Sequence, residues 1–421
     1  MRQSIKDFLE IIKSRGFIHQ TTNLNLLQKE HLRIIGYTGF DCTAETLHVG
    51  SLLQLMLLRW LQKTENKPIV LIGGGTTKIG DPSGKDTTRK ILEQSLINKN
   101  ANGIRNIIER FIDFNDSHNG AILVNNASWL DDLNYIKFLR NFGCHFSVNR
   151  MLTFDSVKTR LEREQNLSFL EFNYMITQAY DYYILNKDYD CNVQFGGSDQ
   201  WGNIVNGIDL VRKTSENEKS PQVHAITSPL ITTANGNKMG KTANGAIWLS
   251  ETHFSVFDFW QFWRNTNDAD VFRFLKLFTE IELNEIKRYE KLKGAELNEV
   301  KIILANEVTK VTHGNNKSLQ ALQASKEIKE KGWSKESIPN TNLKKEFLVK
   351  GIPAFQIFSL STLLCQSNSE ARRLIKQGGA KINGKKITDF NKIIDESYIK
   401  ENNSLYISAG SKRHALIKII D

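Results

Sequence analysis

Residues 32–75 read LRIIGYTGFDCTAETLHVGSLLQLMLLRWLQKTENKPIVLIGGG, and this stretch decides the fold. It begins with a short apolar, β-branched run at residues 32–37, and residues 51–62 are then mostly apolar at helical spacing. Residues 68–72 are fully apolar and end in three glycines. The pattern predicts a buried parallel strand, a crossover helix and a second buried parallel strand, so the fold class is α/β.

His48 and Gly50 fall at the expected start of that helix. Unpaired backbone N–H groups and the helix dipole make such a place suitable for a triphosphate, and a glycine lets a nucleotide approach the backbone closely. A second segment far downstream, Lys238–Thr242 with the sequence KMGKT, offers two more cations. Either segment alone is more often an ordinary helix start or a solvated turn. Together, with the carboxyl edge of a parallel sheet as the ligand crevice, they predict ATP held from two sides.

Five sequence blocks follow one another along the chain. They are Tyr37–Gly50, Gly80–Lys85, Tyr174–Asp181, Gly196–Asn203 and Lys238–Thr242. In content and order they resemble the class I aminoacyl-tRNA synthetases, and among these the bacterial-type tyrosyl-tRNA synthetase family. The resemblance implies a Rossmann-like parallel-sheet catalytic domain, an α-helical domain and a small α+β domain. It also implies activation of L-tyrosine by ATP and transfer of the tyrosyl group to the terminal ribose of tRNA(Tyr).

The reaction determines which residue types the site needs. Because the tyrosine carboxylate is already ionised, its attack on ATP calls for positioning and charge stabilisation rather than a general base. The catalytic residues that the resemblance implies are His48, Thr43, Lys85, Arg89, Lys238, Lys241 and Thr242. Those implied for ATP are Asp41, Gly50, Ser51, Gly197, Asp199 and again Lys241. For Lys85 and Arg89, a solvated basic turn remains the alternative. We expect Mg²⁺ bound mainly through the phosphates and no dedicated metal site.

Two residues depart from the family pattern. Ser51 stands where the family often has a second His, and its shorter, uncharged side chain would make a weaker or water-mediated contact with the ATP ribose. Cys42 stands where a Pro is common, and it adds a thiol that would make the site sensitive to alkylation.

Three polar residues share one face of an expected helix over residues 170–185. Tyr174, Gln178 and Asp181 lie at positions i, i+4 and i+7 of that helix. Without the resemblance, Asp181 reads as an ordinary exposed charge and Tyr174 as a core aromatic residue. Asp199 and Gln200 follow another strand that ends in glycines, at residues 193–197, which places them on the same edge of the sheet.

The resemblance turns this face into a tyrosine pocket. The residues implied for tyrosine are Tyr37, Asp81, Tyr174, Gln178, Asp181 and Gln200. Among them, Asp181 and Tyr37 would meet the phenolic hydroxyl group. Phenylalanine would leave this buried polar pair without its partner, so the pocket would reject it.

Composition narrows the partners and the compartment. The chain of 421 residues carries 56 Lys and Arg against 46 Asp and Glu, a net charge of +10 that favours a polyanionic partner. Its four cysteines, at positions 42, 144, 191 and 365, lack the paired spacings of a zinc site or a disulfide framework. We therefore expect no zinc and a reducing compartment, the cytoplasm, of either a bacterium or an organelle. No apolar run approaches the length of a membrane span, so we expect no membrane partner.

The chain divides into four expected segments. These are a catalytic domain at residues 1–228, the signature loop with an α-helical anticodon-side domain at 229–335, a linker at 336–350 and a C-terminal domain at 351–421. In the last segment, two helices precede a short strand between glycine-containing turns, which resembles the S4 RNA-binding domain. The residues expected to contact RNA, rather than DNA, are Arg372, Arg373, Lys376 and Lys381. A solvated basic face is the alternative.

Other interpretations of the chain stay open at this point. The resemblance and the apolar stretch Trp129–Phe146 favour a homodimer, although the stretch could equally be ordinary core. A tryptophanyl-tRNA synthetase is the alternative enzyme, disfavoured because Asp181 and Tyr37 call for a hydroxyl group rather than an indole edge. A non-catalytic RNA-binding descendant of a synthetase is the third possibility. It would be expected to lose the phosphate-binding His and Lys residues, which this chain keeps.

Overall fold

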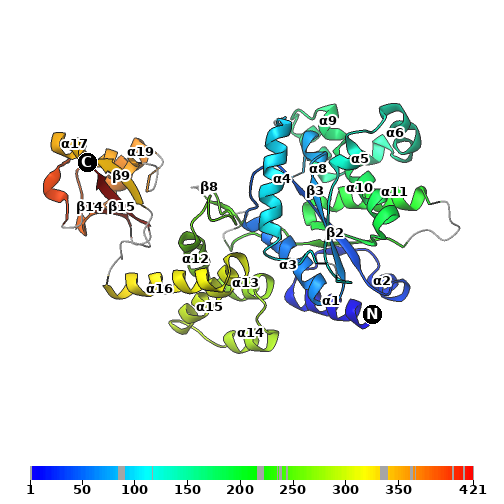
Figure 1. The fold of residues 1–421 in the computed structure, drawn as a ribbon, viewed down its shortest axis with the longest axis horizontal. Helices are drawn as coiled ribbons and strands as arrows, with labels where there is room; N and C mark the ends of the chain where they lie inside the picture. The colour runs from blue at the N-terminus through cyan, green and yellow to red at the C-terminus, as the bar shows by residue number, and fades with distance from the viewer. Residues whose placement is uncertain are drawn as a thin grey trace. The chain divides into compact units, whose positions relative to one another are not determined.

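The computed structural model describes the chain apart from residues 1, 84–90, 116, 216–221, 235, 237–238, 243–244, 332–339, 361–363, 366, 401–402, 411–412 and 421. Two compact units make up the chain, Met1–Ser318 and Leu319–Asp421 (Figure 1). The first contains a large sheet with helices on both faces, and the second contains a smaller sheet. The α/β fold class and the small C-terminal α+β domain are thus confirmed.

A six-stranded sheet in the order β1-β6-β5-β2-β3-β4 forms the centre of the first unit. Its strands are β1 (Gln20–Thr21), β2 (Ile35–Asp41), β3 (Lys67–Gly73), β4 (Ile122–Asn125), β5 (Val193–Gly197) and β6 (His224–Ser228). All neighbouring strands are parallel except the pair β1 and β6. Strands β3 and β6 are buried along almost their whole length. The apolar sequence of β3 predicts this burial for a strand covered on both faces, whereas β6 also buries the polar residues His224, Thr227 and Ser228.

Helices cover the two faces of this sheet (Figure 1). They are α1 (Arg2–Arg15), α2 (Leu24–Glu30), α3 (Val49–Lys63), α4 (Gln94–Ile108), α5 (Ala127–Leu130), α6 (Tyr135–Asn141), α7 (Val148–Met151), α8 (Asp155–Glu162), α9 (Phe169–Phe172), α10 (Tyr174–Tyr189) and α11 (Trp201–Lys213). Helix α3 packs on β2 and β3, and α1 packs on α3. Helices α10 and α11 pack on each other. None of the described helices is both long and apolar enough to cross a membrane.

The helix expected over residues 170–185 is interrupted at Asn173, which ends α9 and precedes α10. A capping box formed by Ser168 and Glu171 starts the short helix α9. Tyr174, Gln178 and Asp181 nevertheless all lie on α10, so their predicted common face exists.

The centre of the sheet opens where β2 and β5 diverge. These strands pair only through Gly36 with Val193 and Tyr37 with Gln194, although both continue toward their carboxyl ends. The chain runs from β2 outward to β3 and β4 on one side, and from β5 to β6 on the other. Such a reversal of strand order leaves no crossover helix above the gap, so a ligand crevice forms there.

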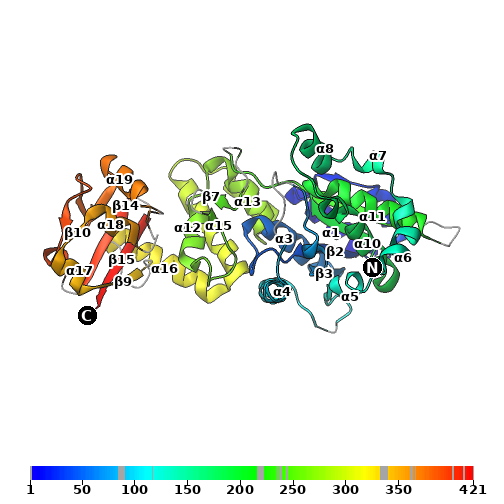
Figure 2. The ribbon, with the colours of Figure 1, turned by 90° about the horizontal axis from the view of Figure 1, so that it is seen from above.

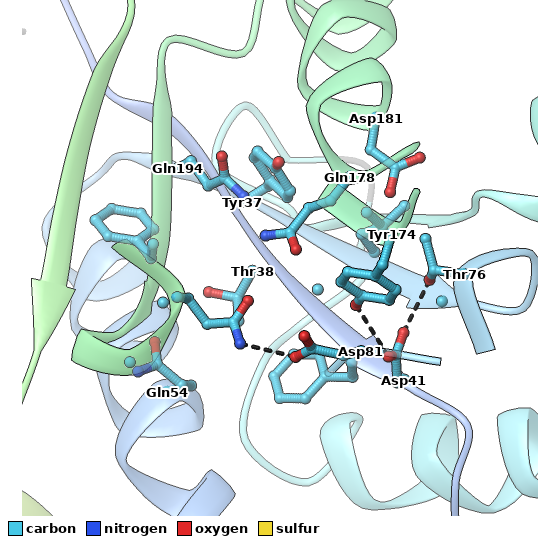
Figure 3. A pocket seen from close by; sticks show the side chains of 18 of the residues that line it. Tyr37, Thr38, Asp41, Gln54, Thr76, Asp81, Tyr174, Gln178, Asp181 and Gln194 are labelled. Atoms are coloured by element: carbon cyan, nitrogen blue, oxygen red, sulfur yellow. Dashed lines mark hydrogen bonds between the residues drawn. The ribbon is translucent and has the colours of Figure 1, made fainter. Parts of the chain in front are cut away.

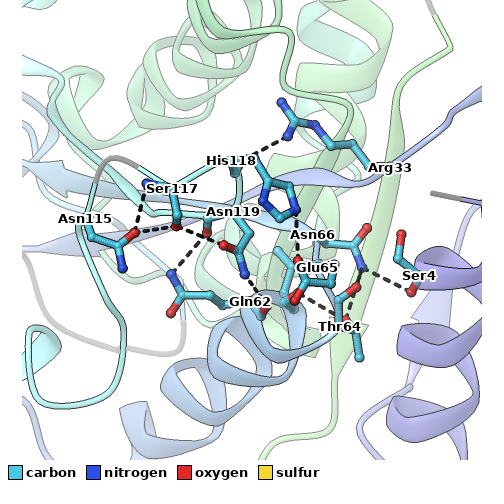
Figure 4. Close-up of polar contacts among 11 residues, drawn as sticks. Ser4, Arg33, Gln62, Thr64, Glu65, Asn66, Asn115, Ser117, His118 and Asn119 are labelled. Atoms are coloured by element: carbon cyan, nitrogen blue, oxygen red, sulfur yellow. Dashed lines mark hydrogen bonds and ion pairs between the residues drawn. The ribbon is translucent and has the colours of Figure 1, made fainter.

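Polar contacts fix the opposite, amino-terminal end of the sheet (Figure 4). The Asn66 side chain accepts a hydrogen bond from the Ile34 amide (2.8 Å) and donates one to the Ser4 carbonyl (3.1 Å). Gln62 near the end of α3 donates to the carbonyl groups of Asp113 (2.7 Å) and Asn119 (3.1 Å). These contacts hold α1 and the loop before β4 against the turn from α3 into β3.

The rest of the first unit is helical. A small hairpin, β7 (Lys241–Thr242) and β8 (Gly245–Ala246), precedes α12 (Val256–Arg264), α13 (Val271–Phe278), α14 (Leu283–Tyr289) and α15 (Glu296–His313), and α16 (Asn315–Lys331) runs across the boundary of the two units. Trp260, Trp263 and Phe278 are fully buried, with the Trp263 and Phe278 rings 5.0 Å apart. The aromatic residues of this region therefore form core.

The second unit has its own five-stranded sheet, in the order β12-β11-β14-β15-β9 (Figure 2). Its strands are β9 (Asn340–Lys344), β11 (Ala380–Ile382), β12 (Lys385–Lys386), β14 (Ser404–Ala409) and β15 (Arg413–Ile420), and a separate pair is formed by β10 (Ile352–Pro353) and β13 (Ile393–Ile394). The helices are α17 (Lys345–Lys350), α18 (Ala354–Ser359) and α19 (Asn368–Lys376). Apolar side chains of the sheet and these helices form one buried core.

The prediction of a linker over residues 336–350 is wrong for residues 340–350, and residues 336–339 lie outside the described residues. Residues 340–344 form β9, which pairs in parallel with β15, and residues 345–350 form α17. Leu343 and Leu348 explain the difference, because each buries its side chain in the core of the second unit. Phe347 and Val349 are apolar as well but exposed, so the apolar residues of this segment follow neither a strand nor a helix pattern clearly.

Candidate active site

A cavity of about 250 Å³ lies between the diverging ends of β2 and β5 (Figure 3). Side chains from β2, β5, α3 and α10 line it. The predicted site residues found in its lining are Tyr37, Asp41, Thr43, Asp81, Tyr174, Gln178, Asp181, Gly197, Asp199 and Gln200. Segments far apart in the sequence thus supply one site, at the edge of the sheet where the strand pattern predicted it.

One end of the cavity holds a buried carboxylate beside a buried hydroxyl group. Asp181 is 1% exposed, and its two oxygens accept hydrogen bonds from Asn126 Nδ2 (2.9 Å) and Trp129 Nε1 (2.8 Å). Burial raises the pKa of Asp181 to about 7, against the opposing effect of these two donors. The Tyr37 hydroxyl group is buried as well and has no hydrogen-bond partner among the described residues. A ligand hydroxyl group would satisfy both side chains.

Sequence analysis missed the two residues that hold Asp181. Asn126 follows β4 directly, and its side-chain oxygen also accepts a hydrogen bond from the Gly75 amide (2.7 Å). Its place after the apolar run of residues 121–124, at the carboxyl edge of the sheet, is the signal that could have found it. Trp129 belongs to the stretch interpreted as dimer surface or core, whereas its indole N–H donates to the site carboxylate.

A second cluster of polar side chains is centred on Asp41 (Figure 3). Its carboxylate accepts hydrogen bonds from Thr76 Oγ1 (2.8 Å) and from the Tyr174 hydroxyl group (3.0 Å). Gly73 makes this arrangement possible, because a Cβ atom there would lie 2.2 Å from Asp41 Oδ1. Burial and then the charge of Asp41 hold the pKa of Tyr174 well above its usual range, so Tyr174 remains a hydrogen-bond donor.

Asp81 and Gln200 both line the cavity and are hydrogen-bonded to each other. Gln200 Nε2 donates to Asp81 Oδ2 (2.8 Å), and the Ser83 amide donates to Asp81 Oδ1 (2.9 Å). Nearby, Gln178 Oε1 is buried and has no hydrogen-bond partner among the described residues. These oxygens form an acceptor-rich region, which is the environment that a substrate ammonium group requires.

The first turn of α3 carries the predicted catalytic histidine. His48 is the N-cap residue, and its Nδ1 accepts a hydrogen bond from the Gly50 amide (2.9 Å). Because Nδ1 accepts, a neutral His48 ring carries its proton on Nε2 and presents a donor there. A Cβ atom at Gly50 would lie 2.6 Å from His48 Cε1, so this glycine makes room for the imidazole ring. Ser51 lies in the same turn, outside the cavity lining.

The structure brings the second signature segment to this helix start. The Val49 amide donates to the Ile247 carbonyl (2.9 Å), and the Ile247 amide donates to the Gly240 carbonyl (3.0 Å). Gly240 has a φ of +91°, and a Cβ atom there would approach the Gly50 amide nitrogen to 3.2 Å. The glycine of KMGKT thus packs directly on the first turn of α3, as expected if both segments hold one nucleotide.

Some predicted site residues are not described in full. Lys85, Arg89 and Lys238 lie outside the described residues. For Lys241 and Thr242 the structure describes the backbone, which forms strand β7. The roles expected of these five residues therefore remain predictions.

Cys42 differs from its predicted behaviour. The side chain is fully buried, and burial raises the pKa of its thiol to about 12. Because thiolates rather than thiols react with alkylating agents, the expectation of an alkylation-sensitive site is wrong. The backbone of Cys42 instead anchors the loop after β2, since its amide donates to Thr77 Oγ1 (2.7 Å) and its carbonyl accepts from Asn100 Nδ2 (2.8 Å).

The four cations expected to contact RNA are all exposed in the second unit. Arg372 lies on α19 with its guanidinium carbon 4.1 Å from the centre of the Phe355 ring, and Lys376 Nζ lies 5.4 Å from that of Phe390. Arg373 is also on α19, whereas Lys381 is on β11. The exposed Lys386, directly across from Lys381 in the β11–β12 hairpin, was not among the predicted contacts.

Comparison with known proteins gives the family. Residues 28–329 match tRNA synthetases class I (W and Y), and residues 360–399 match the S4 domain. The chain is 51% identical over 414 residues to the tyrosine–tRNA ligase of Rickettsia bellii, covering 98% of this chain and 100% of that protein. It is 50% identical over 416 residues to the tyrosine–tRNA ligase of Rhodospirillum rubrum, covering 98% of each.

Solved structures agree with this assignment. A C-terminally truncated mitochondrial tyrosyl-tRNA synthetase of Aspergillus nidulans matches with a TM-score of 0.69 at 29% identity, covering 78% of this chain and 97% of that one. A tryptophanyl-tRNA synthetase of Encephalitozoon cuniculi, with a TM-score of 0.52 at 13% identity, shares the fold alone. The chain therefore belongs to the tyrosine–tRNA ligase family of class I aminoacyl-tRNA synthetases and carries a C-terminal S4 domain.

Proposed function

We propose that this protein activates L-tyrosine with ATP and transfers the tyrosyl group to the 3′-terminal ribose of tRNA(Tyr). The observation that carries the proposal is the buried pair of Asp181 and Tyr37 at one end of the cavity. Asp181 has lone pairs free beyond its two protein donors, and the Tyr37 hydroxyl group has no protein partner among the described residues. A phenol both donates and accepts, so it fits this pair, whereas an indole N–H can only donate.

The rest of the cavity suits the amino acid backbone. The substrate ammonium group would bind among Asp81, Tyr174 and Gln178, whose oxygens accept hydrogen bonds. Gln200, fixed by Asp81 (2.8 Å), would lie near the substrate carboxylate or the adenylate ribose. Tyrosine would then lie with its ring toward Asp181 and its carboxylate toward the first turn of α3.

ATP would be held from the two signature segments. His48 would direct its Nε2 proton toward the phosphates, because Nδ1 is occupied by the Gly50 amide. Thr43 lines the cavity, and Lys241 and Thr242 follow the glycine that packs on this helix. Together with Lys85, Arg89 and Lys238, they would stabilise the charge that moves onto the leaving pyrophosphate. Asp41, Gly50, Ser51, Gly197 and Asp199 would bind the nucleotide.

A magnesium ion bound with ATP would be ligated mainly by phosphate oxygens and water. The carboxylate oxygens of both Asp41 and Asp81 already accept hydrogen bonds from protein donors. Mg²⁺ usually keeps several waters and few protein ligands in nucleotide sites, which agrees with this arrangement. The ion would neutralise charge on the triphosphate during the attack.

We also propose a homodimer and a reducing compartment, the cytoplasm. Large exposed apolar side chains occur repeatedly between α6 and α9, and they are Tyr135, Ile136, Val148, Leu161 and Phe169, each about half exposed or more. Such residues favour a surface covered by a second copy of the chain. The four cysteines are unpaired, as expected where thiols stay reduced.

The second unit would bind tRNA. Arg372, Arg373, Lys376 and Lys381 are exposed, and Arg372 and Lys376 lie over aromatic rings. Cations held in this way would contact the phosphates of a folded RNA.

Tyrosine-dependent exchange of pyrophosphate into ATP tests the first step. We expect exchange with tyrosine and not with the other nineteen amino acids, because only a phenol satisfies Asp181 and Tyr37 together. The assay needs no tRNA, so it reports the cavity alone. Exchange with tryptophan instead would contradict the pocket assignment, and its absence with every amino acid in folded protein would favour a non-catalytic RNA-binding protein.

A further inference from the structure

The five-stranded sheet of the second unit has one face that has not been assigned a role. On its other face, Leu405, Ile407 and Ile417 share one buried core with Ala371 and Ile375 of α19. Because side chains alternate along a strand, the residues between these point away from α19. We call this second side the outer face of the sheet.

Two rings lie on the outer face. Tyr406 on β14 and His414 on β15 are both partly exposed, and neither belongs to the buried core of the unit. Their ring centres are 5.7 Å apart, their planes are inclined by 19°, and the Tyr406 hydroxyl group is hydrogen-bonded to His414 Nδ1. The two rings therefore hold each other in nearly parallel orientations at the surface.

The turn between β11 and β12 is fixed to the strand that carries Tyr406. The Asn383 amide donates to the Tyr406 carbonyl (2.7 Å), and Asn383 Oδ1 accepts from the Tyr406 amide (3.0 Å). Asn383 Nδ2 also donates to the Tyr398 carbonyl (2.6 Å). These bonds hold the β11–β12 hairpin in place beside the two rings.

Three exposed lysines of the outer face lie around the rings. Lys381 is opposite Ser408 and Lys418 is opposite Ser404, so the two lysines lie on either side of Tyr406 along β14. Lys386 lies directly across from Lys381. Among the strand residues that point to this face in the described part of the second unit, none is Asp or Glu. The face therefore combines flat rings with positive charge.

We propose that the outer face binds an unpaired nucleotide of tRNA, with its base stacked on Tyr406 and His414 and the adjacent phosphates held by Lys381, Lys386 and Lys418. This inference rests on the proposed function. Unpaired bases stack on aromatic side chains, and lysines beside them bind the backbone, so rings and cations together favour RNA. Since α19 packs on the other side of the sheet, this surface is separate from that of Arg372, Arg373 and Lys376.

The test measures binding of tRNA(Tyr) to full-length wild type, Tyr406→Leu and Tyr406→Phe. We expect Tyr406→Leu to raise the Kd by about 5- to 150-fold, the effect of losing one stack of a base on an aromatic ring. Tyr406→Phe keeps the ring, so it should keep most of the affinity. A fully paired RNA duplex should bind wild type and Tyr406→Leu equally, because its bases are already stacked on one another.

Salt dependence separates the cations from the rings. The double variant Lys381→Gln with Lys418→Gln should lower the slope of log K against log salt concentration by about 1.4 to 1.8, since each phosphate contact contributes about 0.7 to 0.9. Tyr406→Leu should leave that slope unchanged, because it removes no charge.

Tyr398→Leu is the matched control in the same unit. The Tyr398 ring packs against the buried core, so its loss should leave the affinity for tRNA(Tyr) unaffected. Wild-type affinity of Tyr406→Leu, or an equal loss in Tyr406→Leu and Tyr398→Leu, would overturn the role of the outer face. An equal loss for tRNA(Tyr) and for the duplex would overturn the stacking of an unpaired base. Failure of the wild type to bind tRNA(Tyr) would instead contradict the proposed function of the second unit, and this inference with it.

Discussion

Asp181 combines a carboxylate with complete burial, and this combination makes the stability of the protein depend on pH. Burial raises the pKa of Asp181 to about 7 in the folded protein, whereas an unfolded chain has the ordinary value of about 3.9. The folded protein therefore binds this proton more tightly than the unfolded chain does. The stabilising contribution of protonated Asp181 is complete below about pH 4 and is lost as the pH rises through about 7.

We expect Asp181→Asn to remove this loss of stability at higher pH, because an Asn side chain does not ionise. Relative to wild type, the free energy of unfolding of the variant should rise between pH 5 and pH 8 by a few kcal/mol, because each pKa unit corresponds to about 1.4 kcal/mol. Urea unfolding at several pH values measures the difference. Asp132→Asn is the control, since Asp132 is exposed. A constant difference between wild type and Asp181→Asn across this range would contradict the prediction.

At the scale of one element, the first turn of α3 depends on a glycine for a steric reason. Gly50→Ala should favour the helix by its intrinsic propensity, yet the new Cβ atom would meet the His48 ring at 2.6 Å. We expect the imidazole to leave its N-cap position and adenylate formation to slow by about 10- to 100-fold, the range for a lost hydrogen bond to a charged group. Pre-steady-state kinetics measure the rate, and tyrosine affinity should be unchanged.

A double variant tests more directly whether Gly50 acts through His48. If Gly50 acts through His48, the double variant Gly50→Ala with His48→Ala should be no slower than His48→Ala alone. Rates that multiply would mean that Gly50 acts on the nucleotide directly, as the sequence first indicated.

The sequence predicted the elements of the catalytic unit better than it predicted their contacts. The apolar run at residues 68–72 forms strand β3 because burial on both faces requires such a run, and residues 193–197, which end in two glycines, form strand β5 as predicted. The hydrogen bonds from Asn126 and Trp129 to Asp181 span more than fifty residues, so no local pattern reveals them. The divergence of β2 and β5 is likewise invisible locally, because it depends on where the chain reverses its strand order. Strand β9 was missed because only Leu343 carries its apolar signal.

At the scale of the whole molecule, we propose that the first unit activates tyrosine and the second unit binds tRNA, and each unit has its own buried core. The described residues that line the cavity belong to the first unit, and the exposed cations Arg372, Arg373, Lys376 and Lys381 belong to the second. A chain that ends at Lys331 keeps α16 intact and lacks the whole second sheet. One that ends at Gly351 would keep β9 without its partner β15, so the earlier end is the better design.

We expect the chain ending at Lys331 to exchange pyrophosphate with tyrosine at nearly the wild-type rate and to charge tRNA more than tenfold more slowly. Replacing the four cations by Gln in the full-length protein tests the charges themselves. If each contacts one phosphate, the slope of log K against log salt concentration for tRNA binding should fall by about 3, since each contact contributes about 0.7 to 0.9. The apolar core of the second unit is untouched by these changes, so its folding should survive. Wild-type charging by the shortened chain would remove the second unit from tRNA recognition, and wild-type charging by the Gln variant would remove the four proposed phosphate contacts.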